Sequence, residues 1–213
     1  MSKLLKVRRG DALLVVDVQN DFCPQGALAV PRGDAVVPVI NRIAGRFSVV
    51  VATQDWHPAG HVSFAASHPG KKPFETVKVK GIEQVLWPDH CVAGTRGADF
   101  HPRLDLTPFH FLIRKGTNPG MDSYSTFLEN DHRTSTGLAG LLRELGVKRL
   151  FLAGLATDYC VLYSARDGIE AGFKAVVLED ACRGVNVPSG SIRKAMLEMR
   201  DRGVRVVKTA ELG

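Results

Sequence analysis

The sequence predicts a single three-layer α/β/α domain built on a central, mainly parallel sheet of about six strands. Short segments rich in β-branched residues alternate along the chain with segments whose apolar residues recur at helical spacing. The strand-like segments are apolar throughout, which is typical of strands that helices cover on both faces. The chain of 213 residues is long enough for one such domain with a sizeable core. Together these observations indicate an open, Rossmann-like fold.

The first half of the chain supplies three strands and one helix. The segments "ALLVVDV" and "SVVVATQD" combine β-branched and apolar residues over the length of a strand. Between them, "DAVVPVINRIAGRF" repeats apolar residues at helical spacing. The predicted elements are a strand at 12–18, a helix at 34–47, a strand at 48–55 and, after a long gap, a strand at 110–116.

The second half alternates regularly between helices and strands. Its first helix carries four leucines at helical spacing. A glycine follows each of its three helices, as is common at helix C-termini: Gly146, Gly172 and Gly203. The predicted order is helix 136–146, strand 149–155, helix 157–172, strand 174–181, helix 189–203 and strand 204–209.

The long gap, residues 56–109, contains no convincing long helix or strand, although "ETVKVKG" is compatible with one short strand. A compact domain rarely keeps so long an irregular connection unless it forms a binding site or a lid. We therefore expect residues 1–213 to form one domain, in which residues 56–109 are an insertion that builds the metal and substrate site described below.

Composition places the chain among ordinary globular proteins, with 45% hydrophobic and 23% charged residues. No apolar run approaches the ~20 residues that span a bilayer, and the N-terminus lacks a secretory signal, so we expect a cytoplasmic protein without a membrane partner. The four cysteines lie far apart without a CxxC pair and are expected to stay reduced. The formal charge of +6 comes without a nucleic-acid-binding motif, which argues against a nucleic-acid partner.

Four chemically capable residues fall at the carboxyl ends of predicted strands, where open α/β sheets bind ligands. Asp17 lies at the end of the first strand, Asp55 of the second and Lys115 of the third, and Cys160 follows the fourth. A helix N-terminus and a nearby cation lower the pKa of a thiol, so Lys115 is expected to favour a thiolate at Cys160. Asp17 would then accept and return a proton. From spacing alone, a packed cysteine and a turn-forming aspartate explain these residues equally well.

A second group of residues has the pattern of a metal site. Asp55 and His57 are two residues apart on an extended segment, so their side chains can share one face. His61 and His90 lie in the same long loop region. One carboxylate with two or three histidines suits one divalent zinc, iron or manganese ion, with room left for water or substrate. We expect Asp55, His57 and His90 to be ligands, whereas a solvated or capping role explains His61 equally well.

Three aromatic residues could line a slot for a small planar ligand. Phe22 follows the first strand, Trp87 is close to His90, and Tyr124 lies in "NPGMDSYSTF". Stacking against aromatic walls favours flat molecules. An ordinary core role explains the three residues equally well.

Five stretches of the sequence resemble the nicotinamidases, the pyrazinamide-activating branch of the isochorismatase-like cysteine hydrolases. They are "VVDVQNDFCPQGALAV", "TQDWHPAGHVSFA", "WPDHCVAGTRGADFHPRL", "IRKGTNPGMDSYSTF" and "LAGLATDYCVLYSARDG". They cover nearly the whole chain in matching order and spacing. A metal loop combined with a cysteine triad is specific to this branch, because isochorismatases and carbamoylsarcosine-type amidases lack the metal loop. The resemblance implies an isochorismatase-like fold and hydrolysis of nicotinamide to nicotinate and ammonia, a step in recycling nicotinamide to NAD.

The resemblance also implies roles for individual residues. The positions that match the family's motifs are the triad Asp17, Lys115 and Cys160, the metal ligands Asp55, His57 and His90, the slot walls Phe22, Trp87 and Tyr124, and the oxyanion-hole amides of Ala156 and Cys160. His61 matches a histidine that binds the metal in some members only, and Ser63 matches a position that contacts it through water in some. Relatives have a cis peptide at the position of Leu155–Ala156. Thr157 and Asp158 are expected to cap the helix that carries Cys160.

Three other functions share parts of this pattern. A sister amidohydrolase for carbamoyl or ureido substrates would need the triad but not the metal ligands. A metal-water hydrolase would not need Cys160, and a non-catalytic metal-binding module would turn over no substrate. The sequence leaves open the physiological metal, a homo-oligomer, and whether pyrazinamide or other ring carboxamides are accepted.

Overall fold

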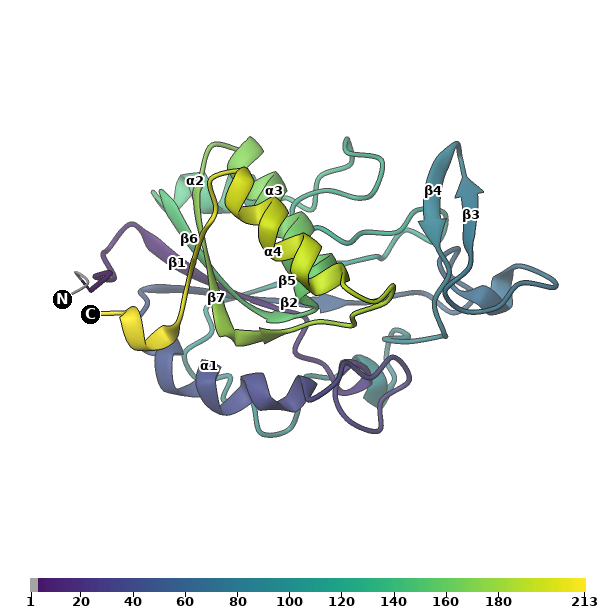
Figure 1. Ribbon diagram of the computed structural model, residues 1–213, viewed down its shortest axis with the longest axis horizontal. Helices are drawn as coiled ribbons and strands as arrows, with labels where there is room; N and C mark the ends of the chain where they lie inside the picture. Colours follow the sequence, from purple (N-terminus) through teal and green to yellow (C-terminus); the bar gives the residue numbers. More distant parts are fainter. Residues whose placement is uncertain (1–3) are drawn as a thin grey trace.

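The structure, a computed structural model, describes residues 4–213 and has the three-layer α/β/α architecture predicted from the sequence (Figure 1). Its central sheet has six strands in the order β5-β2-β1-β6-β7-β8, and every pairing is parallel. The predicted strands are all present. They are β1 (Asp11–Val16), β2 (Val49–Asp55), β5 (Phe111–Lys115), β6 (Arg149–Leu155), β7 (Lys174–Arg183) and β8 (Arg205–Val207).

The predicted helices cover both faces of this sheet. Figure 1 shows α1 (Val37–Ala44) on one face and α2 (Leu138–Glu144), α3 (Leu162–Glu170) and α4 (Ser191–Asp201) on the other. The glycines expected after the last three helices all have positive φ angles, a region that residues with a side chain rarely adopt. The φ values are 70° at Gly146, 93° at Gly172 and 83° at Gly203.

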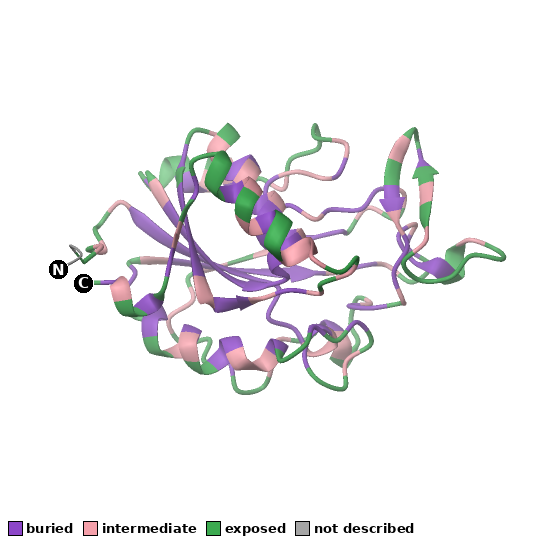
Figure 2. Cartoon of the chain, in the orientation of Figure 1, coloured by how far each residue is buried: buried purple, intermediate pink, exposed green. Residues whose placement is uncertain are grey.

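Strand β1 shows why the sheet needs two helical layers. Successive side chains of a strand point to opposite faces, so a strand that is apolar throughout has two faces to bury. Leu13 belongs to the same core as Ile40 of α1, whereas Leu14 belongs to the core of Leu142 of α2. All four side chains are almost completely buried. Figure 2 accordingly shows buried central strands between helices whose outer faces are exposed.

Residues 56–109 contain a β-hairpin, of which the sequence indicated only the first strand. Strands β3 (Thr76–Val79) and β4 (Ile82–Val85) pair antiparallel, separate from the main sheet. Lys80 and Gly81 form the two-residue turn with φ angles of 49° and 84°, as hairpins of this length require. The sequence did not predict strand β4, because "IEQV" is short and half polar.

At the carboxyl end of the sheet, a glycine lets two strands approach closely. Gly154 of β6 has a φ angle of 117°, and it pairs with Val16 at the end of β1. A Cβ atom on Gly154 would lie 2.1 Å from the carbonyl oxygen of Val16. The absence of a side chain therefore brings together the residues that follow β1 and β6.

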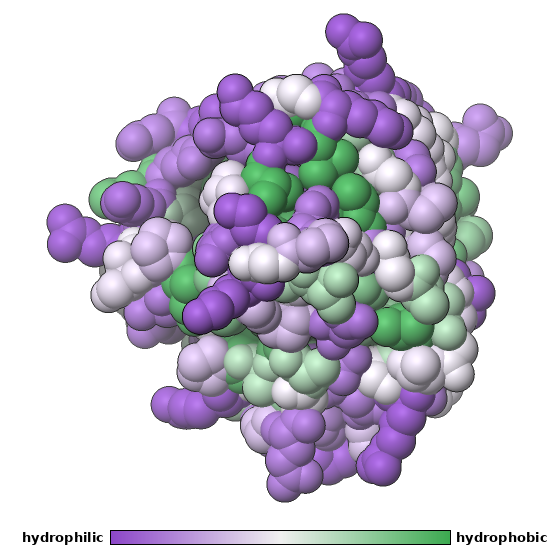
Figure 3. Space-filling view, turned by 90° about the vertical axis from the view of Figure 1, so that its right-hand side faces the viewer, coloured by the Kyte–Doolittle hydropathy of each residue, from purple (hydrophilic) through white to green (hydrophobic). Residues whose placement is uncertain are grey.

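Two other sequence expectations can be compared with the described residues. All four cysteines are buried and unpaired. No helix within residues 4–213 is both long and apolar enough to cross a membrane. Figure 3 looks onto the end of the molecule that lies at the right of Figure 1, where hydrophilic side chains surround a smaller group of hydrophobic ones.

Candidate active site

Residues from four neighbouring strand ends meet at the carboxyl end of the sheet. Asp17 follows β1, Asp55 and Lys115 are the last residues of β2 and β5, and Cys160 lies just beyond β6. The Lys115 Nζ atom lies 2.9 Å from Asp17 Oδ2 and 3.5 Å from Cys160 Sγ, and it also contacts the Asp55 carboxylate. The fold therefore brings together the acid, base and thiol that the sequence placed at separate strand ends.

Lys115 is a buried cation whose charge is compensated locally. Its side chain is 0% exposed, and Nζ donates a hydrogen bond of 2.9 Å to the carbonyl oxygen of Ser123. Burial lowers the pKa of a lysine, but the Asp17 and Asp55 carboxylates outweigh burial and hold the pKa of Lys115 well above its usual value. Lys115 therefore stays positively charged beside the Cys160 sulfur.

Asp17 is equally buried and has a raised pKa. The Thr53 hydroxyl donates a hydrogen bond of 2.5 Å to Asp17 Oδ1, while Lys115 faces the other oxygen. Burial raises the pKa of Asp17, Lys115 lowers it only in part, and Asp55 raises it further, which brings it to about 6. A carboxyl group with this pKa can take up and release a proton near neutral pH.

Cys160 lacks the lowered pKa that its sequence position suggested, and that expectation was wrong. Burial raises the pKa of the thiol, Lys115 lowers it, and the Asp17 and Asp55 carboxylates raise it, so that the pKa stands well above its ordinary value. The thiol therefore keeps its proton in this structure. A base lies close by, because ligand atoms of Asp17, Asp55 and Cys160 all lie within 4.8 Å of one another.

The turn beneath Cys160 also differs from the expected helix start. Thr157–Val161 form a π-helical turn ahead of α3, and no side chain caps it. Asp158 instead accepts hydrogen bonds of 2.9 and 2.8 Å from the backbone N–H groups of Val185 and Asn186. The prediction that Thr157 and Asp158 cap the helix was wrong, because a loop distant in sequence supplies the donors that hold the carboxylate.

Asp55, His57 and His90 form a compact, buried group suited to binding a metal ion. Asp55 Oδ2 lies 3.8 Å from His57 Nε2 and 4.0 Å from His90 Nε2. The other ring nitrogen, Nδ1, lies 3.0 Å from the Gly116 carbonyl oxygen in His57 and 2.8 Å from that of Pro88 in His90. A carbonyl oxygen only accepts, so each Nδ1 donates, and in the neutral ring each Nε2 keeps a free lone pair. This donor set fits one divalent metal ion.

Asp55 links this metal-type group to the triad. Its Oδ1 contacts Lys115, while Oδ2 faces the two histidines. Burial works against the ionised form of Asp55, but Lys115 and the histidines outweigh burial and hold its pKa well below the usual range. The buried Gln19 fixes the Asp55 backbone, because its amide donates to the Asp55 carbonyl at 2.8 Å and accepts from the Asp55 N–H at 2.8 Å. No sequence pattern indicated this role of Gln19.

His61 lies beside His57, with ring centroids 4.3 Å apart, but both of its ring nitrogens have protein partners. Nε2 lies 2.9 and 3.2 Å from the carbonyl oxygens of Asn118 and Met121, and Nδ1 lies 2.8 Å from Ser63 Oγ. Since the carbonyls only accept, Nε2 is the donor and Nδ1 accepts the Ser63 hydrogen. His61 and Ser63 therefore lie next to the group of Asp55, His57 and His90, and they are hydrogen-bonded to each other.

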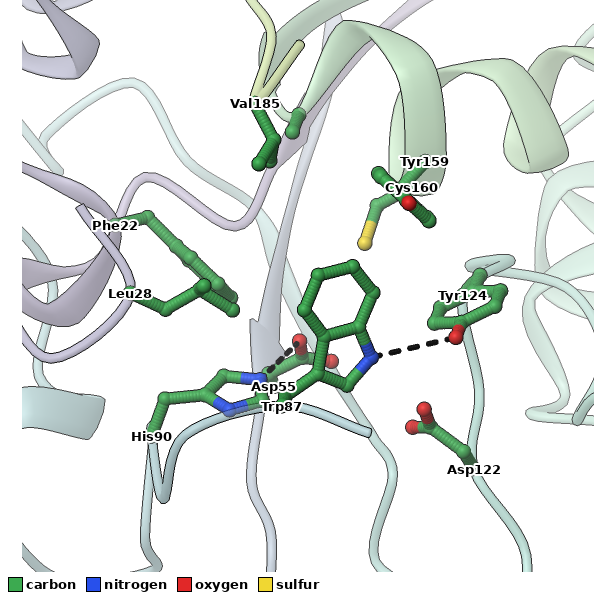
Figure 4. Close-up of a pocket in the computed structure, with 11 residues that line it drawn as sticks. Phe22, Leu28, Asp55, Trp87, His90, Asp122, Tyr124, Tyr159, Cys160 and Val185 are labelled. Atoms are coloured by element: carbon green, nitrogen blue, oxygen red, sulfur yellow. Dashed lines mark hydrogen bonds and ion pairs between the residues drawn. The ribbon is translucent and has the colours of Figure 1, made fainter. Parts of the chain in front are cut away.

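The three predicted slot residues line one pocket, and Figure 4 shows the Cys160 sulfur pointing into it. Trp87 donates a hydrogen bond of 3.3 Å from Nε1 to the Tyr124 hydroxyl, and Phe22 forms the opposite side. The walls enclose about 360 Å³, including the mouth that opens to solvent. The pocket suits a small planar molecule.

Other residues of this pocket had not been indicated by the sequence. Asp122 is buried and accepts a hydrogen bond of 2.9 Å from Gln84 of the hairpin. The Tyr159 ring lies 4.8 Å from the Trp87 ring, and its position next to Cys160 in the chain could have identified it. The additional lining residues are Leu28, Asp122, Tyr159 and Val185.

Ala156 lies between β6 and the turn that carries Cys160, and it lines the same pocket. The Leu155–Ala156 peptide is cis, as the family resemblance implied. Ala156 and Cys160 thus line the same pocket, as an oxyanion hole built from their backbone amides would require.

Comparisons with known proteins agree with this site and fold. A family model described as isochorismatase domain matches residues 11–211. A protein of Acinetobacter baylyi named nicotinamidase is 46% identical over 208 residues, which cover 98% of this chain and 97% of that protein. A solved structure described as an Acinetobacter baumanii nicotinamidase and pyrazinamidase superposes with a TM-score of 0.94 at 48% identity, covering 96% of this chain and 98% of the other.

A second solved structure adds a metal to the comparison. The pyrazinamidase of Pyrococcus horikoshii in complex with zinc has a TM-score of 0.77 at 37% identity, and the match covers 93% of this chain and 99% of that one. Family model, sequence and structure thus agree over nearly the full length. The chain belongs to the isochorismatase domain family.

Proposed function

We propose that this chain is a metal-dependent nicotinamidase, a cysteine amidohydrolase that converts nicotinamide and water to nicotinate and ammonia. The observation that carries the proposal is that Cys160, Asp55 and His90 line one pocket. Lys115 lies beside Cys160 and pairs with Asp17, and His57 completes the group of Asp55 and His90. The names of the similar proteins support nicotinamide as the substrate. Pyrazinamide, converted to pyrazinoate, is a second substrate supported by the same names.

The first half of the reaction forms a thioester. Asp17 takes the proton of Cys160, and the thiolate, stabilised by Lys115, attacks the carboxamide carbon. The attack places a negative charge on the carboxamide oxygen, and the backbone N–H groups of Ala156 and Cys160 donate hydrogen bonds to it. Such an interaction is worth about 3 kcal/mol per donor in other enzymes. Asp17 then gives its proton to the departing nitrogen as the carbon–nitrogen bond breaks. Ammonia leaves, and the acyl group remains on the sulfur.

The second half releases the acid. Asp17, ionised again, accepts a proton from water as the water oxygen attacks the thioester carbon. The carbon–sulfur bond breaks, nicotinate leaves, and the proton held by Asp17 returns to Cys160. The pKa of about 6 at Asp17 suits a group that must act as base and acid in alternation.

Asp55, His57 and His90 would hold the metal ion. When bound, the ion would supply a Lewis acid that binds the pyridine nitrogen and fixes the ring. The aromatic walls at Phe22 and Trp87 would hold the ring from its faces. Zinc, iron and manganese all suit this donor set, so availability would decide which ion is used.

Ammonia release from nicotinamide by purified protein of measured metal content tests the proposal. We expect turnover with one metal ion per chain, loss of turnover on chelation, and recovery when zinc, iron or manganese is returned. Cys160→Ala should release no ammonia, and a near-normal rate in this variant would overturn the thioester route.

The competing functions give different results in the same experiment. A carbamoyl or ureido amidohydrolase would not depend on the metal, a metal-water hydrolase would resist alkylation of Cys160, and a binding module would release no ammonia with the metal loaded. The cytoplasmic location and the absence of a nucleic-acid partner stay predictions from the sequence. Whether the protein forms a homo-oligomer stays an open question.

A further inference from the structure

The carboxylate of Asp21 joins two loops that build the site. Asp21 lies in the short turn after β1, directly before Phe22. Its Oδ2 accepts a hydrogen bond of 2.7 Å from the backbone N–H of Cys91, and its Oδ1 accepts one of 3.2 Å from that of Ala27. Cys91 directly follows the candidate ligand His90. One side chain thus connects the metal loop to the loop that supplies Phe22.

His90 needs such support more than the other two candidate ligands. Asp55 belongs to strand β2, and His57 follows it by two residues. His90 lies in an irregular segment that is distant in sequence from the described strands of the main sheet. Besides the Asp21 contact, the Cys91 backbone has one other fixed partner, because its carbonyl accepts a hydrogen bond of 3.0 Å from the His57 N–H. Cys91 therefore has both of its peptide groups held, and His90 is placed by them.

The backbone conformation of Cys91 is an uncommon one. Cys91 has a φ angle of 46°, in the left-handed region that residues with a side chain rarely occupy. A carboxylate that accepts from the Cys91 N–H is a charge-assisted partner and stronger than a neutral one.

The surroundings of Asp21 also favour its contact with the Cys91 N–H. No lysine, arginine or histidine lies within ion-pair distance of Asp21 among residues 4–213, so backbone N–H groups are its partners. The carboxylate packs against Gly97, where an added Cβ would lie 2.1 Å from Oδ2. The loop around Gly97 thus leaves just enough room for Asp21 to reach Cys91.

We propose that Asp21 is a positioning residue that holds His90 in place for metal binding. The proposal rests on the metal site of the proposed function. Asp21 does not line the pocket, and its link to His90 is the hydrogen bond from the Cys91 N–H. Removing the carboxylate should weaken metal binding and leave the chemistry at Cys160 intact once the metal is supplied.

The test measures the zinc dissociation constant by competition with a chelator, for the wild type and three variants. Asp21→Asn keeps the shape but removes the charge, and it should weaken zinc binding about 10- to 100-fold, as loss of a group that orients a ligand does elsewhere. Gly97→Ala keeps Asp21 but displaces its carboxylate, and it should weaken zinc binding in the same direction. Asp99→Asn, an exposed change of equal charge in the same loop, should leave zinc affinity unchanged.

A second measurement separates positioning from general damage. The melting temperature of the metal-free Asp21→Asn protein should stay near that of wild type, and kcat at saturating zinc should recover to within about twofold. Zinc affinity equal to wild type in both Asp21→Asn and Gly97→Ala would overturn the inference, as would a wild-type protein that binds no zinc. A wild type that binds zinc tightly but leaves nicotinamide intact would refute the proposed function and leave the role of Asp21 standing.

Discussion

The ammonium group of Lys115 lies 3.5 Å from the sulfur of Cys160, and the same group is ion-paired with Asp17 and Asp55. Lys115 therefore offsets both buried carboxylates and also lies beside the thiol. Its fully buried position means that its removal would leave negative charges facing each other without solvent.

Lys115→Met should accordingly lower both the unfolding free energy of the protein and the reactivity of the Cys160 thiol. Removal of one partner of a buried ion pair typically costs about 3–5 kcal/mol of unfolding free energy, and a loss of this size is expected in urea unfolding of the metal-free protein. Alkylation of Cys160 by iodoacetamide should slow at pH values below the pKa of the thiol, because a smaller fraction of the thiol is ionised without the cation. Lys78→Met, an exposed change in the hairpin, is the control and should alter neither. Equal urea midpoints for Lys115→Met and wild type would contradict this account.

The raised pKa of Asp17 predicts how activity depends on pH. The proposed base must be ionised, so kcat/KM should fall about tenfold per pH unit below a midpoint near pH 6. The Thr53 hydrogen bond favours the ionised form of Asp17, so Thr53→Val should move this midpoint to higher pH. A profile that stays flat down to pH 4.5, or a midpoint that moves to lower pH in Thr53→Val, would exclude Asp17 as the titrating base.

The same pKa sets the sign of a stability effect. Between about pH 4 and pH 6, folded Asp17 binds a proton that the unfolded chain has already released. The unfolding free energy contributed by this group is therefore largest at low pH and falls as pH rises through this window. Comparison of wild type with Asp17→Asn, which cannot titrate, isolates the contribution in urea unfolding of the metal-free protein.

The fold could be predicted because its signals are local. Each strand of the main sheet contains a continuous apolar run, and each helix repeats apolar residues at helical spacing. Glycines such as Gly146 mark the helix ends with a conformation that few other residues adopt. The convergence of Asp17, Lys115 and Cys160 also followed from sequence, because parallel strands place their carboxyl ends on one edge. The short strand β4 lacked a clear periodicity and was missed.

The properties that could not be predicted depend on burial and on partners distant in sequence. The pKa of Cys160 is set by the depth of its site and by carboxylates from β1 and β2, and these outweigh the nearby Lys115. Asp158 lies in the helix start but is held by the loop after β7. The place of Asp122 in the pocket depends on the hairpin, through Gln84. A pattern within one segment contains none of this information.

The hydrogen bonds of His61 predict that it does not bind the metal ion. Both ring nitrogens have protein partners, whereas the Nε2 atoms of His57 and His90 are free to coordinate. His61→Asn should therefore retain one metal ion per chain after dialysis, with an affinity within about tenfold of wild type, as for a group outside the ligand set. His57→Asn is the matched comparison and should lose the metal. Loss of metal to the same extent in both variants would make His61 a ligand.

Gly154 offers the sharpest test of how the strand ends are brought together. An alanine there would have to adopt a φ angle of 117° and place its Cβ 2.1 Å from the Val16 carbonyl oxygen, which belongs to the rigid backbone of β1. The conformational cost alone is of order 1–3 kcal/mol, and the clash adds to it, so Gly154→Ala should lose more than about 3 kcal/mol of unfolding free energy.

Gly45→Ala is the matched control for this substitution. Gly45 follows α1 with a φ angle of −65°, and an added Cβ would meet nothing within 4 Å. The alanine should be neutral or stabilise the protein by up to about 1 kcal/mol, because it restricts the unfolded chain. Urea unfolding of both variants gives the comparison. A Gly154→Ala protein as stable as Gly45→Ala would mean that β1 and β6 can separate without cost, and the close approach of Asp17 to Cys160 would then need another cause.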